Sequence, residues 1–242
     1  TVGYIITMLS GLGFAYFGHS GALHGIYISG LTLIFFAGVL MVIALWPWNK
    51  EYHQADPAYA RTKGGVDLER AAFFTTALTT LLSALFGAIP GANFGNGFQV
   101  FLAENVIRYT GKTVLEYSVI GHLHIMLALI AIMITLIIGR WLNFKGILHK
   151  IAMPLMILGT FVLNIGVWGV VTPFQPIAHM IIYVGATPSM LAALLLLIWS
   201  WGKLSRDHTA HIAKPNFFQR VSGLLRDPLK FGPTWQMLFM NF

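Results

Sequence analysis

The chain has 242 residues, of which 57% are hydrophobic and only 10% are charged, with a formal net charge of +7. Soluble domains carry about 25% charged residues, so this composition excludes a water-exposed globular surface and indicates lipid as the solvent for most side chains. The sequence contains no cysteine, which excludes a disulfide framework, an iron–sulfur cluster, a cysteine-bound zinc site and covalently attached c-type haem within this chain.

Apolar runs long enough to cross a membrane follow one another along the chain. Residues 4–17 are apolar but too short to span, and the first complete span is predicted at 27–46, ending near Trp46 and Trp48. The later spans are predicted at 71–89, 114–139, 148–171 and 177–201. An amphipathic stretch at 98–109 is expected at the membrane interface. We therefore predict an all-α fold, a polytopic transmembrane helix bundle of five full spans plus an N-terminal apolar segment.

The predicted spans divide the chain into two regions. Residues 1–202 form the transmembrane helix bundle, and 203–242 form a basic cytoplasmic tail or a cytoplasmic connection to further segments. The sequence begins with Thr1 and runs straight into apolar residues, without the basic region or cleavage site of a signal peptide. We expect both ends to be cut from a longer polypeptide.

The distribution of basic residues predicts the orientation. Five spans place 49–70, 140–150 and 203–242 on one side of the membrane, and these segments hold 13 of the 15 Lys and Arg residues. Because positive residues that flank spans stay cytoplasmic, this side is predicted to face the cytoplasm of a prokaryotic inner membrane. The basic residues flank apolar runs and form no aromatic-interleaved patch, so the expected partner is the lipid bilayer and not nucleic acid.

Histidines at membrane depth are the most informative feature of the sequence. In the GHLH motif, His122 and His124 lie about two turns into the third span from its outer end, His179 lies near the outer end of the fifth span, and His19 and His24 precede the first. Ionisable side chains inside a membrane are costly and usually mark function. We take these five histidines as candidate cofactor-binding residues, with His122 and His124 as candidate ligands of haem iron.

The spacing of His122 and His124 bears on what they bind. Residues two apart on a helix point about 200° apart, so the two imidazoles cannot chelate one ion and imply two separate partners. Haem suits this geometry, because each imidazole supplies one axial ligand and the macrocycle fills space between helices. Small residues are expected to let a flat cofactor approach the helix backbones; these are Gly121, Gly159, Gly166 and Gly169.

Each of these residues also has a purely structural interpretation. A lone buried histidine such as His179 or His149 can be a hydrogen-bonded packing residue, and His19 and His24 can be plain loop residues. Glu116 is either a proton-path group or a hydrated interfacial carboxylate. The remaining histidines are expected to be solvated; they are His53, His208 and His211.

The run LEYSVIGHLHIMLALIAIMITLIIGRW, residues 115–141, resembles the tenth helix of the haem–copper oxidase and nitric oxide reductase superfamily, especially the C-type oxidases. Residues 148–171 and 67–91 are similar to its neighbouring helices, so the chain resembles the last five helices of a twelve-helix catalytic subunit. The resemblance implies that His122 binds a high-spin haem and that His124 binds a low-spin haem.

The sequence departs from that family at the active-site metal. Where the family has two adjacent histidines, this chain reads GHSGALHG, in which His19 precedes Ser20 and the next histidine is His24. The family's helices that carry the other metal ligand and the other haem ligand have no counterpart in the 242 residues of this sequence. The resemblance therefore supports haem b, one or two groups, but not copper or non-haem iron.

Three functions follow from these patterns. The first is a membrane-bound redox subunit that binds b-type haem near the outer face and carries electrons in a respiratory complex, from quinol or cytochrome c to other membrane and cytochrome subunits. The second is a catalytic oxygen or nitric oxide reductase core of which this chain is a part. The third is a haem-free transporter or structural membrane subunit. Membership of an oxidoreductase complex is favoured, and no residue is assigned a catalytic role.

Overall fold

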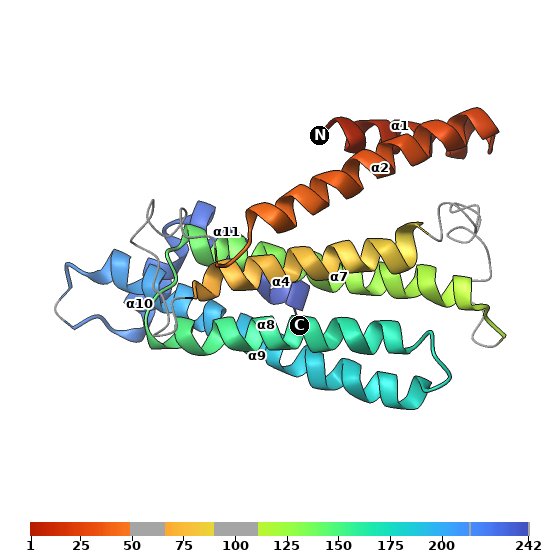
Figure 1. Cartoon of the computed structure of the whole chain (residues 1–242). Helices are drawn as coiled ribbons and strands as arrows, with labels where there is room; N and C mark the ends of the chain where they lie inside the picture. Colours follow the sequence, from red (N-terminus) through yellow and green to blue (C-terminus); the bar gives the residue numbers. More distant parts are fainter. Residues whose placement is uncertain (49–65, 90–110, 213, 242) are drawn as a thin grey trace.

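The computed structural model describes residues 1–48, 66–89, 111–212 and 214–241, and this part of the chain is almost entirely helical. Five of its helices are long and apolar enough to cross a membrane (Figure 1). They are α2 (Gly21–Ala44), α4 (Leu68–Ser83) continued by the π-helix η1 (Ala84–Ala88), α7 (Val114–Trp141), α8 (Ile147–Gly169) and α9 (Gln175–Thr209). The shorter apolar helix α1 (Val2–Phe17) precedes them, so the predicted fold class is confirmed.

The ends of α2 and α9 differ from the predicted spans. Helix α2 begins at Gly21, earlier than predicted, because Ser20 caps it by accepting a hydrogen bond from the Leu23 N–H. Helix α9 continues past the predicted end of its span to Thr209. Its 35 residues are about 52 Å long, more than the roughly 30 Å of a bilayer core. The predicted interfacial stretch 98–109 lies outside the described residues.

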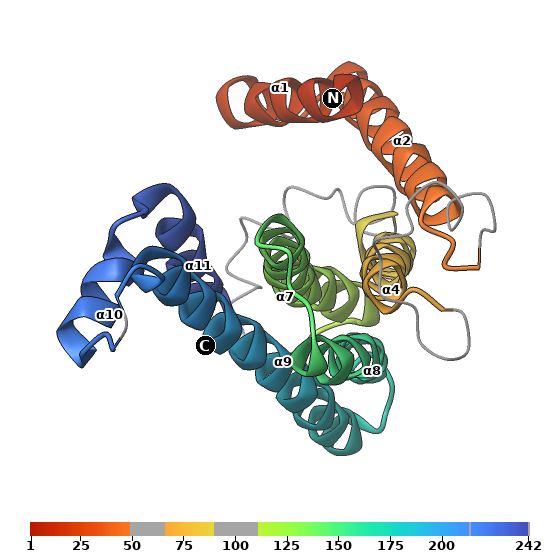
Figure 2. The ribbon, with the colours of Figure 1, turned by 90° about the vertical axis from the view of Figure 1, so that its left-hand side faces the viewer.

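Helices α8 and α9 pack side by side and share a more extensive contact than any other pair of described helices (Figures 1 and 2). A Cβ added at Gly159 would meet the Ser189 backbone nitrogen at 2.7 Å, and one added at Gly185 would clash with the backbone of Leu163. Small residues thus let the two backbones touch, as is usual between membrane helices. The prediction that Gly159, Gly166 and Gly169 make room for a cofactor is wrong, because α9 fills that space.

The apolar core of the bundle lies between α4, α7, α8, α9 and a helix from the C-terminal region. Its fully buried members come from each long helix of this group and include Leu136, Met153, Met156 and Leu196. Helices α1 and α2 contribute almost nothing to it, and their hairpin leans away from the other helices (Figure 2). Only the C-terminal part of α2 approaches α4 (Figure 1).

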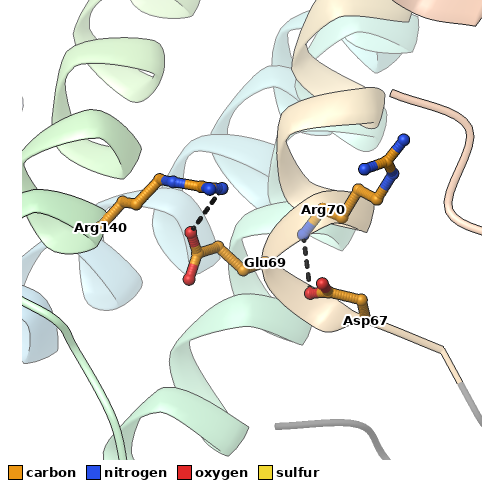
Figure 3. A network of polar contacts seen from close by, with 4 residues as sticks. All are labelled: Asp67, Glu69, Arg70 and Arg140. Carbon is orange, nitrogen blue, oxygen red and sulfur yellow. Dashed lines mark hydrogen bonds and ion pairs between the residues drawn. The ribbon is translucent and has the colours of Figure 1, made fainter. Parts of the chain in front are cut away.

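A polar network joins α2 and α7 to the start of α4. The Arg70 guanidinium donates to the carbonyl oxygens of Ala44 and Trp46, which are left without helical partners at the end of α2. Asp67 caps α4 by accepting from the Arg70 N–H at 3.0 Å, and Glu69 pairs with Arg140 of α7 at 3.4 Å (Figure 3). These contacts fix the three helix ends at what we call the basic end, where α2, α7 and α9 end and α4 and α8 begin.

The region 203–242 contains the end of α9 and two further helices, α10 (Phe217–Leu225) and α11 (Pro228–Asn241). Asp227 precedes α11 and accepts from the Lys230 N–H, and the hydrogen bond from the Lys230 side chain lowers the pKa of the Asp227 carboxyl. Helix α11 then packs against α7 and α9. Trp201 Nε1 donates to Thr234 Oγ1 at 2.7 Å, and Asn241 Nδ2 donates to Thr135 Oγ1 at 2.9 Å.

Candidate functional site

His122 of α7 is held by α4. Its Nδ1 atom lies 3.1 Å from both the carbonyl oxygen and the hydroxyl oxygen of Ser83, the fully buried last residue of α4. A carbonyl oxygen can only accept, so Nδ1 carries the proton and Nε2 carries the lone pair. Among the residues that the structure describes, none forms a hydrogen bond with Nε2. The imidazole is therefore oriented, with its basic nitrogen available to a ligand.

The π-helix η1 shapes the wall against which His122 lies. The Ile89 N–H bonds to the Ala84 carbonyl, five residues earlier, where an α-helix would bond four residues earlier. Gly87 of this turn faces α7 so closely that an added Cβ would collide with the Cβ of His122 and meet the Ser118 carbonyl at 2.8 Å. Single π-turns occur frequently at functional sites. Here the turn brings a residue without a side chain opposite the histidine.

His122 also lines an apolar cavity of about 410 Å³ between α2, α4 with η1, and α7. Its walls include Phe35 of α2, Leu81 of α4 and Met126 of α7. Among the described residues that line the cavity, His122 is the only one that can ionise. A mostly apolar space of this size, with one oriented polar group, has the character of a small-molecule or cofactor site, for which volumes of about 300–1,000 Å³ are usual.

His124 lies on a different side of α7, as the spacing predicts. Its ring is exposed, and its Nδ1 lies 2.8 Å from the Ile120 carbonyl of the same helix, which directs Nε2 away from that carbonyl. Large apolar side chains of α7 are exposed as well, among them Leu127 and Ile130. The described part of the chain places no second wall against His124, so any cofactor there would need one from elsewhere.

The other candidate histidines do not join His122. His179, in the first turn of α9, is exposed with Nδ1 at 2.8 Å from the Gln175 carbonyl. His19 and His24 do come together, with Nε2 of the first 2.9 Å from Nδ1 of the second, beside Phe14. They lie at the turn between α1 and α2, apart from the ends of α4 and α7 (Figure 1). Within the described ranges, no three His, Asp or Glu side chains group as a metal site would require.

Two further ionisable residues have structural partners. Glu116 forms a capping box at the start of α7, where its carboxylate accepts from the Thr113 N–H at 2.6 Å. His149 is buried near the start of α8 and makes an edge-to-face contact with Phe144 at 5.5 Å. The capping box gives Glu116 a role at the helix end without any need for proton transfer.

Ser83 and Gly87 are the members of the His122 site that the sequence did not reveal. Each lies in an apolar run that reads as an ordinary span, and Ser83 is 39 residues from His122 in the chain. Comparisons of the chain with protein-family models, with curated proteins and with solved structures find no match.

Proposed function

We propose that this multi-pass membrane protein is a redox subunit that binds b-type haem, with His122 as an axial ligand. One observation carries the proposal: the Nδ1 atom of His122 is engaged by the Ser83 carbonyl at 3.1 Å, beside an apolar cavity of about 410 Å³. Histidine ligands of metals usually donate their second ring nitrogen in this way, which fixes the tautomer and raises the basicity of the other nitrogen. Haem iron accepts such a neutral imidazole.

The residues that line the His122 cavity are compatible with a bound haem. A haem macrocycle is largely apolar, and the cavity walls from α2, α4 and α7 are apolar except for His122 and Thr80. Bound haem supplies one-electron transfer at its iron. The chain contributes the rest: Ser83 holds the imidazole in place, Gly87 leaves space for it, and the surrounding helices keep water away from the ligand nitrogen.

His124 extends the proposal to a second haem. An ionisable side chain that faces lipid is costly, and such residues usually face a bundle interior or a cavity. His124 lies ten residues, about 15 Å, along α7 from Val114, and its ring is exposed. We infer that further helices or a partner subunit cover this side of α7 and that a second b-type haem is ligated there. The resemblance to the haem–copper oxidase superfamily likewise assigns the two histidines to separate haems, a high-spin one at His122 and a low-spin one at His124.

In this proposal the chain belongs to a respiratory complex of a prokaryotic inner membrane, with its basic end in the cytoplasm. Quinol or cytochrome c is the electron donor, and other membrane and cytochrome subunits are its partners. A catalytic alternative, reduction of oxygen or nitric oxide, rests on the sequence resemblance, in which His19 and His24 occupy the place of the family's metal-binding histidines; the two rings contact each other but do not join His122. The contact brings two imidazoles together without a third ligand among the described residues.

The test is a reduced-minus-oxidised absorbance spectrum of the purified protein, combined with a pyridine haemochrome assay. The native protein is expected to show b-type bands, and His122→Ala and His124→Ala should each lose about one haem per chain where two are bound. His211→Ala is the matched control, because His211 is exposed beyond the end of α9. Unchanged haem content in both site variants would refute the proposal.

A carbon monoxide difference spectrum on the same samples separates the two redox functions. Electron transfer through six-coordinate haem predicts no response, whereas a catalytic high-spin haem binds carbon monoxide. A colourless native protein that incorporates no added haem would instead favour a haem-free transporter or structural subunit.

A further inference from the structure

A second cavity, of about 560 Å³, lies at the basic end between the loop that joins α7 to α8, the end of α9 and the start of α10. Three cationic side chains line it: Lys145 from the loop, Arg206 from α9 and Arg220 from α10. No Asp or Glu is among the described residues of its lining. The nearby carboxylate of Asp207 pairs with Lys203, at 3.8 Å, and lies outside the lining. The cavity is therefore strongly positive.

Backbone contacts fix the cations around this space. Ser205 Oγ donates to the Arg220 carbonyl at 3.1 Å, which ties α10 to α9 and places Arg220 at the cavity. Arg206 Nε donates to the Gly202 carbonyl at 3.1 Å, which holds the arginine stem along α9. The two arginines come from different helices but reach one cavity. One phosphate-like anion could therefore accept hydrogen bonds from both guanidinium groups, and arginine is well suited to bind such oxyanions through two parallel hydrogen bonds.

The other wall of the cavity is apolar. Ile147 and Leu148 of α8 and Ile198 and Trp199 of α9 line it, and Trp199 packs edge-to-face on Phe144 at 4.9 Å. Ile147 and Ile198 are also exposed on the outer surface of the bundle. The cavity thus opens from a cationic region onto the membrane-facing surface.

The spacing along α9 matches the layers of a bilayer. Trp199 and Arg206 are seven residues apart, about 10 Å along the helix axis. Tryptophan prefers the boundary between hydrocarbon and headgroups, and the headgroup region on one side of a bilayer is about 5–8 Å thick. With Trp199 at this boundary, the Cα atom of Arg206 lies just beyond the headgroup layer, and the hydrogen bond from Arg206 Nε to the Gly202 carbonyl turns the guanidinium back into it. Ile198, next to Trp199, then lies at the edge of the acyl chains.

We propose that this cavity binds an anionic phospholipid, with the phosphate between Lys145, Arg206 and Arg220 and an acyl chain along Ile198 and Trp199. A free phosphate ion would use the cations but leave the apolar wall without a partner, whereas a phospholipid uses both. Basic pockets between membrane helices on the cytoplasmic side are suited to such headgroups. The site is separate from the His122 cavity and does not depend on whether haem is bound.

The experiment compares three probes on the purified full chain in a neutral detergent: phosphatidylglycerol, phosphatidylcholine and inorganic phosphate. Retention of lipid is followed by native mass spectrometry, and the thermal midpoint is followed by Trp fluorescence. We expect phosphatidylglycerol alone to be retained and to raise the midpoint. An equal rise with inorganic phosphate would overturn the lipid assignment in favour of a simple anion site. Equal retention of phosphatidylcholine would show that the cations do not select the ligand.

Two matched triple variants test whether the three cationic side chains of the cavity bind the phospholipid. Replacing Lys145, Arg206 and Arg220 by Gln is expected to weaken phosphatidylglycerol binding on the order of a hundredfold, from about tenfold or less per cation. The control replaces Lys150, Lys214 and Arg226 by Gln, which removes the same charge from exposed positions outside the cavity. Equal loss in both triple variants would overturn the site in favour of diffuse surface charge. Should the first variant not fold, the three-probe comparison on the native chain still decides the proposal.

Discussion

His122 is positioned by two residues of another helix that differ in what they provide. Ser83 offers a carbonyl oxygen and a hydroxyl oxygen, each 3.1 Å from Nδ1. Gly87 offers the absence of a side chain, because even a methyl group there would overlap the Cβ of His122. The imidazole is consequently confined by a polar contact on one side and by steric exclusion on another. Both constraints come from the place where α4 passes into the π-turn.

The first prediction concerns Gly87→Ala. The new methyl group would displace His122 or α7, at a cost of about 1–3 kcal/mol in the free energy of unfolding, as is typical of an overpacked core. We expect a lower thermal midpoint together with a loss of bound haem. Both are measured on the purified protein, by thermal unfolding and by the haemochrome assay.

Gly25→Ala is the control for this prediction. Gly25 lies in α2, and an added Cβ there meets nothing within 4 Å. Replacing an unconstrained helical glycine by alanine should stabilise the helix by about 0.5–1 kcal/mol. A Gly87→Ala protein as stable and as haem-rich as the native one would contradict the steric role assigned to Gly87.

The sequence predicts how His122 and His124 are arranged on α7, but not which residue holds His122. The separation of His122 and His124 onto different sides of α7 follows from helical geometry and is observed. The partner of His122 could not be predicted, because Ser83 comes from another span and nothing local marks it. The glycines of α8 pack against α9, and their sequence cannot distinguish a neighbouring helix from a flat cofactor, because both require small residues.

Among the elements, α11 departs most from what its composition suggests. The composition of the basic, proline-containing stretch from 203 onward predicts a cytoplasmic tail or a cytoplasmic connection to further segments, and hydropathy alone cannot show that part of it packs back against the bundle. In the structure Met237 is only 1% exposed, within the core formed by the long helices. The hydrogen bond from Asn241 to Thr135 reaches an interior position of α7. Two polar residues thus satisfy one another where the helix meets the bundle.

The second prediction therefore concerns Met237→Ala. Removing this buried side chain leaves a cavity under α11 and should cost about 2–5 kcal/mol of stability. Met240→Ala in the same helix is the control, because Met240 is 37% exposed and its loss should change stability by no more than about 0.5 kcal/mol.

Unfolding in the denaturing detergent dodecyl sulfate, followed by the combined fluorescence of the seven Trp residues, measures both variants. Trp201 on α9 and Trp235 on α11 pack 5.6 Å apart, so their contribution to the emission changes when α11 undocks. Equal stability of the two variants would show that α11 does not depend on Met237 for its contact with the bundle.

At the scale of the whole molecule, the cations define a direction across the membrane. Of the 11 Lys and Arg residues in the described part of the chain, 10 belong to segments at the basic end. The cavity lined by Lys145, Arg206 and Arg220 lies at this end. His19, His24 and His179 lie at helix ends on the opposite side, since α2 and α9 both begin there. The bundle is thus electrically polarised, with fixed positive charge concentrated at one end and three candidate ligand histidines at the other.

The last prediction tests this orientation with single cysteines, which the cysteine-free sequence allows without any background substitution. Phe174→Cys lies in the turn between α8 and α9, Gly21→Cys lies at the start of α2, and Lys214→Cys lies at the basic end; all three positions are exposed. Because basic flanks stay in the cytoplasm, a membrane-impermeant maleimide should label the first two in intact cells and leave Lys214→Cys unlabelled. Permeabilised cells supply the control, in which all three should react.

The opposite labelling pattern would place the basic end outside, and with it the proposed phospholipid site. Labelling of Gly21→Cys together with Lys214→Cys, while Phe174→Cys stays protected, would also place the basic end outside, and would show in addition that α2 does not cross the membrane in the direction of the bundle. Labelling of Phe174→Cys but not of Gly21→Cys would mean instead that the hairpin of α1 and α2 crosses the membrane differently from the other helices. The position of this hairpin matters for the proposed haem site, because α2 supplies one wall of the cavity beside His122.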